Sequence, residues 1–264
     1  MPFVEYEPSG GLKSFVDAYW VRGMGRRPKA AARRVYADGC ADVIANVGPS
    51  MAYFNPMARP EWTIPLQPGH LYLGGTMTAY GLVHTEPGAL LTGIRFRPGG
   101  LYALYRMSME TAVDSLVEFP DPSLLPLMAR GAGWTTRLDT YLEARLTPPR
   151  HDFASIYRVI AGTGGQVSVE DLAGTCHVSK RTLERIFRLN VGISPKRYIR
   201  IARFQQVLAR LRQPFSEESL LRMAYDLGYY DHAHLTNEFK QYAGILPSEL
   251  SRFYKTGIAH GQYF

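Results

Sequence analysis

The sequence predicts an α+β protein of two domains. Residues 1–147 are expected to form a β-barrel or jelly-roll-like domain with helices at its carboxy-terminal end. Residues 152–255 are expected to form an all-α domain with two helix-turn-helix units joined by a long helix. Three observations support this division: short apolar runs in the first half, a pattern that occurs twice in the second, and Thr147-Pro148-Pro149-Arg150 between them.

The apolar runs of the first half are short and lie between turn residues. The runs at 43–47, 71–73 and 90–96 have the composition of β-strands. Asp38-Gly39 and Glu86-Pro87-Gly88 are typical turn sequences. These features favour a compact β-rich fold.

Helical spacing of apolar residues begins after residue 100 and returns before the Pro-Pro sequence. One stripe with this spacing consists of Leu138, Tyr141, Leu142 and Arg145. Two interpretations are open for it. The stripe either joins two copies of the chain in a homodimer or packs on the protein's own barrel.

The second half repeats one pattern at an offset of 51 or 52 residues. The repeated pairs are Ala173/Ala224, Phe187/Phe239, Gly192/Gly244, Ile193/Ile245, Pro195/Pro247 and Arg200/Arg252. Each copy predicts two short helices joined by a tight turn, with Ser179 and Asp231 as the caps of the second helices. Two copies in register favour a pair of helix-turn-helix units over an ordinary α-hairpin.

A long helix is predicted between the copies. Ser194-Pro195 combines a cap residue with proline at the first helical position, and Gln213-Pro214 ends the pattern. A helix over these residues is about 25 Å long. It can hold two recognition helices near the roughly 34 Å repeat of the major groove.

Positive charge is concentrated in the second half. Residues 150–264 contain 16 Lys and Arg against 10 Asp and Glu, whereas residues 1–149 contain 14 against 13. Between Ser179 and Arg203, eight cations accompany one acid, Glu184. A solvated surface is the ordinary explanation of such a run, but its place on the second helix of a helix-turn-helix indicates contact with nucleic-acid phosphates.

The sequences VSVEDLA, VSKRTLERIFRLNVGISPKRYIR and MAYDLGYYDHAHLTNEFKQYAGILPSELSRFY resemble the DNA-binding domain of AraC/XylS-type transcriptional regulators. The resemblance covers nearly all of residues 150–255. It implies that base-facing positions fall on Arg181, Glu184, Arg185, His232, His234, Thr236 and Asn237. The neighbouring cations complete the predicted DNA-binding set: Lys180, Arg188 and Lys240.

Two positions depart from the family pattern. His177 stands where the family usually has the turn glycine, which predicts a mildly strained turn. Asn237 replaces a common arginine, which predicts weaker phosphate binding or a preference for adenine.

The first half resembles the cupin-like sensory domains of such regulators, chiefly through GIRFRPGG at 93–100. The candidate effector-binding residues are Arg22, Arg26, Arg95 and Arg97. Two guanidinium groups spaced as in Arg22-x-x-x-Arg26 suit phosphate, and the spacing resembles a motif of cyclic-dinucleotide binders. An anionic nucleotide is therefore one hypothesis for the effector, and a solvated loop is the other interpretation of this stretch.

Enzymatic and metal-binding alternatives find little support. His70, His84 and Glu86 lack the clustered spacing of a metal site, and neither a GxSxG nor a GxxxxGK motif occurs, so no metal or cofactor is expected. Two cysteines in 264 residues indicate a reducing compartment. The alternative function is repair of alkylated DNA by a reactive Cys40, although Asp38 and Asp42 beside it should raise its pKa.

The sequence as a whole predicts a transcriptional regulator, activator or repressor, not an enzyme. The expected partners are promoter DNA, a small effector, RNA polymerase and a second copy of the chain. The start of the sequence lacks a signal-like segment, and no run of about 18 apolar residues occurs, so a cytoplasmic protein without membrane contact is expected.

Overall fold

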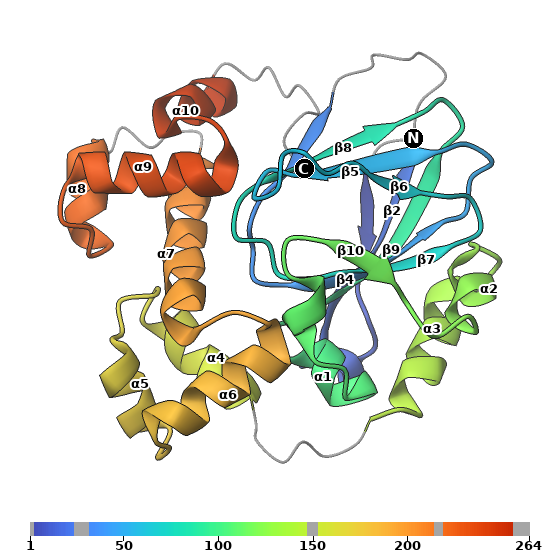
Figure 1. Ribbon diagram of the computed structural model, residues 1–264, viewed down its shortest axis with the longest axis horizontal. Helices are drawn as coiled ribbons and strands as arrows, with labels where there is room; N and C mark the ends of the chain where they lie inside the picture. Colours follow the sequence, from blue (N-terminus) through green and yellow to red (C-terminus); the bar gives the residue numbers. More distant parts are fainter. Residues whose placement is uncertain (1–2, 24–31, 147–152, 214–218, 256–264) are drawn as a thin grey trace.

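The structure is a computed structural model that describes residues 3–23, 32–146, 153–213 and 219–255. A β-rich amino-terminal domain lies beside a helical carboxy-terminal domain, which confirms the predicted α+β architecture of two domains (Figure 1). The predicted linker lies at 147–152, outside the described residues.

The amino-terminal strands form two antiparallel sheets. The larger sheet has the order β1 (Val4–Tyr6), β2 (Val16–Gly23), β9 (Leu90–Phe96), β4 (Ala41–Asn46), β7 (Leu71–Gly74) and β10 (Leu116–Glu118). The smaller sheet has the order β3 (Arg33–Val35), β8 (Gly81–Thr85), β5 (Ala52–Pro56) and β6 (Ile64–Leu66). The strands predicted at 43–47, 71–73 and 90–96 are neighbours in the larger sheet, and the fold is a two-sheet sandwich.

Alternation along the strands gives the larger sheet two different faces. Val43 and Ile94 face a core that includes α1 (Gly100–Tyr105), α2 (Leu124–Met128) and α3 (Trp134–Glu143). On the other face, Trp20 and Leu91 pack with buried residues of the smaller sheet such as Phe54 and Leu66. Two 3₁₀ turns, η1 (Gly10–Leu12) and η2 (Met109–Ala112), also belong to this domain.

The stripe on α3 packs inside its own domain. Leu138 and Leu142 are fully buried in the core between the larger sheet and the helices. The Tyr141 hydroxyl donates to Asp121 at 2.7 Å, and Arg145 forms an ion pair with the same carboxylate at 3.3 Å. The interpretation of this stripe as a contact between two copies of the chain is therefore wrong, because its apolar members are already covered.

Seven helices make up the described part of the carboxy-terminal domain. They are α4 (Phe153–Gly162), α5 (Val169–Thr175), α6 (Lys180–Val191), α7 (Pro195–Leu211), α8 (Leu220–Asp226), α9 (His232–Ala243) and α10 (Pro247–Lys255). Side chains cap the helices as predicted: Ser179 Oγ accepts from Thr182 N at 3.1 Å, and Asp231 Oδ1 from His234 N at 2.7 Å. Ser194 caps α7, with proline at its start.

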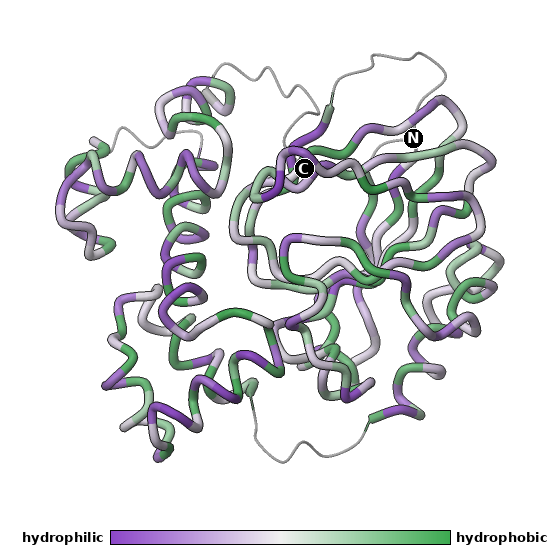
Figure 2. Tube along the Cα trace, viewed as in Figure 1, coloured by the Kyte–Doolittle hydropathy of each residue, from purple (hydrophilic) through white to green (hydrophobic). Residues whose placement is uncertain are grey.

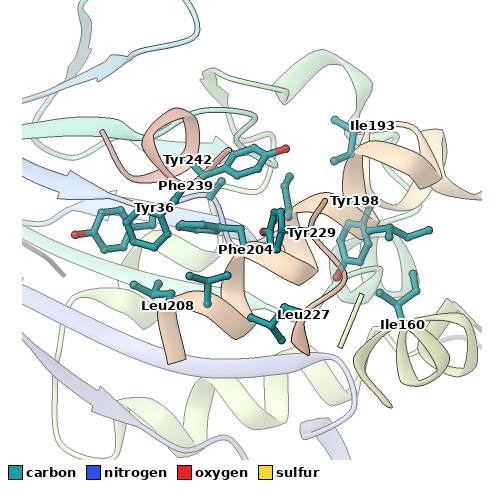
Figure 3. Packing of buried hydrophobic residues seen from close by; sticks show 14 of the residues in the cluster. Tyr36, Ile160, Ile193, Tyr198, Phe204, Leu208, Leu227, Tyr229, Phe239 and Tyr242 are labelled. Carbon is teal, nitrogen blue, oxygen red and sulfur yellow. The ribbon is translucent and has the colours of Figure 1, made fainter. Parts of the chain in front are cut away.

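Phe204, at the middle of α7, lies at the centre of the helical core (Figure 3). Its ring lies 5.2 Å from that of Phe239 and 5.3 Å from that of Tyr242. Tyr36, from the turn after β3 in the other domain, joins this core and meets Phe204 edge to face. Ala37 O accepts a hydrogen bond from Gln205 Nε2 at 2.5 Å, so the turn is attached to α7 by both apolar and polar contacts.

Candidate nucleic-acid interface

The first helix-turn-helix unit consists of α5 and α6. Hydrophilic and hydrophobic residues alternate along α6 (Figure 2), and its hydrophobic residues Leu183, Ile186 and Phe187 are buried on one side of the helix. The predicted contact residues all lie on this helix: Lys180, Arg181, Glu184, Arg185 and Arg188. The four cations are exposed and Glu184 is half-buried. The helix therefore presents a basic face to solvent.

The cations of α6 differ in their contacts. Lys180 forms an ion pair with Glu170, whose pKa it lowers through a hydrogen bond and its charge. Arg188 Nε donates to Glu110 Oε1 of the amino-terminal domain at 2.7 Å. Within the described residues, Arg181 and Arg185 form no ion pair. These two guanidinium groups are thus available to an external acceptor.

The turn of the first unit has the backbone conformation that the sequence predicted to be strained. His177 has a φ of 53°, in the left-handed region. Gly228 has a φ of 71° in the turn of the second unit. The two turns share one backbone shape, with a glycine in one of them and a histidine in the other.

The second unit consists of α8 and α9, and its outward face is polar with little charge. On α9, His232, His234, Asn237 and Lys240 are exposed and Thr236 is half-buried. All five predicted contact residues of this unit therefore lie on one helix and reach solvent. Imidazole, amide and hydroxyl groups can read the edges of bases.

Sequence reasoning missed a buried carboxylate that positions α9. Glu238 is 3% exposed and accepts from Arg200 Nε at 2.6 Å and from the Tyr229 hydroxyl at 3.1 Å. Burial, and then the charge of Glu238, raises the pKa of Tyr229. His234 lies one turn earlier on the same helix, with Nε2 4.0 Å from the carboxylate. The signal in the sequence is an acid at the repeat position that Ile186 occupies in the first unit.

Two cations of the basic run thus hold the domain together. Arg200 pairs with Glu238, and Arg203 donates to the carbonyl oxygens of Gly165 at 3.0 Å and Gly228 at 3.1 Å. The Arg203 guanidinium also lies over the ring of Tyr229. Their charges contribute to the field of the domain while their side chains fix α7 to the second unit.

The candidate effector residues occupy different environments. Arg26 lies outside the described residues. Arg22 is buried on β2, with its guanidinium 5.0 Å from the Phe3 ring, and burial followed by the nearby cations lowers its pKa to about 10. Arg97 lies past the end of β9, where it pairs with Asp17 at 2.9 Å.

Arg95 lies on the sheet face that also carries Arg22. It donates to Glu5 at 3.2 Å and lies 3.7 Å from Asp42. Burial disfavours its charge, but Asp42 and Asp38 outweigh burial and raise the pKa of Arg95. Arg95 and Arg97 therefore pair with different acids.

The reactive-cysteine alternative meets a physical obstacle. Enclosure of the Cys40 thiol, followed by the charge of Asp38, raises its pKa well above the ordinary value, although the residue as a whole is partly exposed. A raised pKa lowers the fraction of reactive thiolate. Among the residues that the structure describes, no group of three potential metal ligands occurs. No described helix has both the length and the hydropathy needed to cross a bilayer.

Comparison with known families divides the chain as the fold does. Residues 172–252 match a helix-turn-helix domain, and residues 4–118 match a domain of unknown function (DUF6597). The chain is 32% identical over 113 residues to an uncharacterized HTH-type transcriptional regulator of Haemophilus influenzae, covering 43% of this chain and 33% of that protein. It is 32% identical over 87 residues to the XylDLEGF operon transcriptional activator 1 of Pseudomonas putida, covering 33% and 26%. The chain thus aligns with a third or less of the length of these curated relatives.

A similarity over nearly the whole chain comes from a solved structure. Wild-type ToxT from Vibrio cholerae strain SCE256, bound to an unsaturated fatty acid, superposes with a TM-score of 0.53 at 13% identity, covering 97% of this chain and 99% of that chain. At this identity the similarity concerns the fold: a β-rich domain followed by a helical pair of helix-turn-helix units. The repeated motifs, the family match and the curated relatives agree for residues 172–252, which form a helix-turn-helix domain similar to that of AraC/XylS-type transcriptional regulators.

Proposed function

We propose that this protein is a sequence-specific regulator of transcription that binds promoter DNA through both helix-turn-helix units. The observation that carries the proposal is the placement of α6 and α9 at opposite ends of α7 (Figure 1), each with a polar or basic face exposed to solvent. Helices joined in this way can enter successive major grooves on one side of the duplex. The activator names of the Pseudomonas putida relatives support activation as the direction of control.

Base reading and phosphate binding divide between residues of α6. Arg181 and Arg185 are exposed, are free of ion pairs within the described residues, and can each bind a guanine edge. Arg188 lies nearer the end of the helix and already holds Glu110, so it is better placed for a phosphate than for a base. We therefore expect Arg185→Ala to cost about 1–3 kcal/mol on the preferred site and to relax one base position.

Selection of binding sites from random duplexes by the full chain tests the proposal. Arg181→Ala and Arg185→Ala should change the selected base sequence, whereas Arg188→Ala should lower the affinity for all duplexes by a similar factor. Arg59→Ala is the matched control, because it removes an exposed cation that lies over Trp62 in the amino-terminal domain. Selection of no preferred sequence by the wild-type chain would contradict the proposal.

We further propose that the amino-terminal domain binds a small effector. The ToxT structure was solved with an unsaturated fatty acid, and its fold is similar to this one, which makes an apolar acid one class to test. A cyclic dinucleotide is the second class, and it depends on Arg22 and Arg26. Calorimetry with both classes decides between them: Arg22→Ala with Arg26→Ala should abolish nucleotide binding, and Arg59→Ala, which removes an exposed cation that lies over Trp62, should not.

Contacts with RNA polymerase and with a second copy of the chain remain part of the proposed function. The buried stripe on α3 is not available for a dimer, so a dimer must use another surface. Repair of alkylated DNA through Cys40 is disfavoured, because burial and Asp38 raise the pKa of that thiol.

A further inference from the structure

The carboxy-terminal ends of both recognition helices contact the amino-terminal domain at equivalent positions of the repeat. Gly192 ends α6 and Gly244 ends α9, with φ values of 77° and 70°. A Cβ atom on Gly192 would lie 2.5 Å from Val113 Cγ2 and 2.6 Å from Met109 O. A Cβ atom on Gly244 would lie 2.4 Å from Tyr80 Cζ. The approach is close enough at both ends to require glycine.

A side-chain hydrogen bond accompanies each of these contacts. Arg188, one turn before Gly192, donates to Glu110 at 2.7 Å. Gln241, three residues before Gly244, donates through Nε2 to the carbonyl oxygen of Thr78 at 3.3 Å. The two units of the repeat are thus held in the same manner, by residues 109–113 at one end and 78–80 at the other.

The two contacting segments of the amino-terminal domain are bonded to each other. Thr78 N and Thr78 Oγ1 each donate to the carboxylate of Asp114 at 2.6 Å, and Asp114 N donates to Thr76 O at 3.2 Å. Asp114 is 7% exposed and has a φ of 51°. A left-handed backbone is unfavourable for residues other than glycine. The hydrogen bonds offset this cost and join the two segments.

The result is a closed ring of contacts. The helix α7 joins α6 to α9 on one side (Figure 1), and segments 76–80 and 109–114 contact their carboxy-terminal ends on the other. A single connecting helix leaves its two ends free to bend relative to each other, whereas a second attachment restricts that motion. The amino-terminal ends of α6 and α9, which carry Lys180, Arg181 and His232, remain exposed.

We infer that segments 76–80 and 109–114, joined by Asp114 and Thr78, are a clamp that fixes the distance and angle between the two recognition helices. This inference rests on the proposed DNA binding and adds a consequence to it. With the clamp closed, the chain accepts only one spacing of the two half-sites. Inserting one base pair moves a half-site by about 3.4 Å and rotates it by about 35°, which a fixed pair of helices cannot follow.

The test compares affinity for the selected site with affinity for the same site carrying one inserted base pair. The wild-type full chain should prefer the original spacing. Asp114→Ala should reduce that preference about three- to tenfold, which corresponds to the net contribution of one typical hydrogen bond. Thr78→Val keeps the backbone donor and removes the hydroxyl, so a smaller reduction of the spacing preference is expected. If Asp114→Ala does not fold, Thr78→Val tests the inference in its place.

Two glutamines provide a matched pair. Gln241→Ala removes a contact of the clamp and should reduce the spacing preference. Gln205→Ala removes a different bond between the domains, at the middle of α7, and should leave the preference unchanged. Equal effects of both variants, or an unchanged preference in Asp114→Ala and Thr78→Val, would overturn the clamp. If the wild-type chain selects no site at all, the proposed function itself is wrong.

Discussion

The two helix-turn-helix units share a backbone pattern but differ in what their equivalent side chains do. At an offset of 52 residues, the cations Lys180, Arg181, Arg185 and Arg188 of the first unit correspond to His232, Ala233, Asn237 and Lys240 of the second. Inside the units, Ile186 of the apolar core corresponds to Glu238 of the buried hydrogen-bond network. The first unit therefore presents cations, which can bind guanine edges or phosphates, and the second presents mostly uncharged polar groups on a helix held by polar contacts.

This difference shows that one supersecondary unit can be fixed in place by two kinds of interior. In the first unit, apolar burial orients α6, and the charge lies outside. In the second, Arg200 reaches from α7 to Glu238, and Tyr229 completes the network, so that charge lies inside. A buried carboxylate with two hydrogen-bond partners fixes direction as well as position.

The largest expected effect comes from placing the same residue at the two equivalent interior positions. Ile186→Gln leaves an amide without partners in an apolar core and should lower the free energy of unfolding by about 3 kcal/mol. Glu238→Gln keeps an oxygen that accepts from Arg200 or Tyr229 and should cost only about 1 kcal/mol. Urea denaturation of the two variants measures both values. Equal losses would mean that the two interiors do not differ as described.

Most of the helical domain could be predicted from the sequence because its signals are local. The caps Ser179 and Asp231, the proline that starts α7 and the left-handed turn at His177 each depend on a few neighbouring residues. The sequence did not predict the burial of Glu238, because an acidic residue on a helix is expected to be exposed unless its partner is known. That partner, Arg200, is 38 residues away in the sequence. Local sequence patterns therefore predict the helices and turns, but they do not predict the buried hydrogen bonds of Glu238 between the helices.

The contacts between distant parts of the chain were beyond the sequence. The stripe on α3 has the spacing of an amphipathic helix, but that spacing does not say whether the covering surface belongs to the same chain. Tyr36 lies in the core of the other domain, and Glu110 meets Arg188 across 78 residues of sequence. Such pairs depend on how the surfaces of the two folded domains pack together, and the periodicity of apolar residues within one helix or strand does not predict that packing.

A charge exchange between the units should have a smaller effect, on binding. Arg185→Asn gives the first unit the residue of the second, and Asn237→Arg does the reverse. On a nonspecific duplex Arg185 has no preferred base to read, and its charge acts on phosphates, so the slope of log affinity against log salt should become shallower by about one for Arg185→Asn and steeper by about one for Asn237→Arg. Titrations of a nonspecific duplex at several salt concentrations measure the slopes. Slopes that move in the same direction in both variants would rule out phosphate contact at one of the positions.

The smallest expected effect concerns the two turns, which share a left-handed residue. His177 has a φ of 53° and carries a Cβ atom, whereas Gly228 has a φ of 71° and carries none. His177→Gly removes the strain but adds freedom to the unfolded chain, so a net gain of about 0.5–1 kcal/mol in the free energy of unfolding is expected. Gly228→Ala introduces the strain and should cost about 1 kcal/mol. Thermal unfolding of both variants measures the two shifts. They should have opposite signs, because the two turns demand the same backbone and only one of them has the residue that adopts it readily; loss of stability in both variants would show that the imidazole of His177 makes a contribution that outweighs its strained backbone.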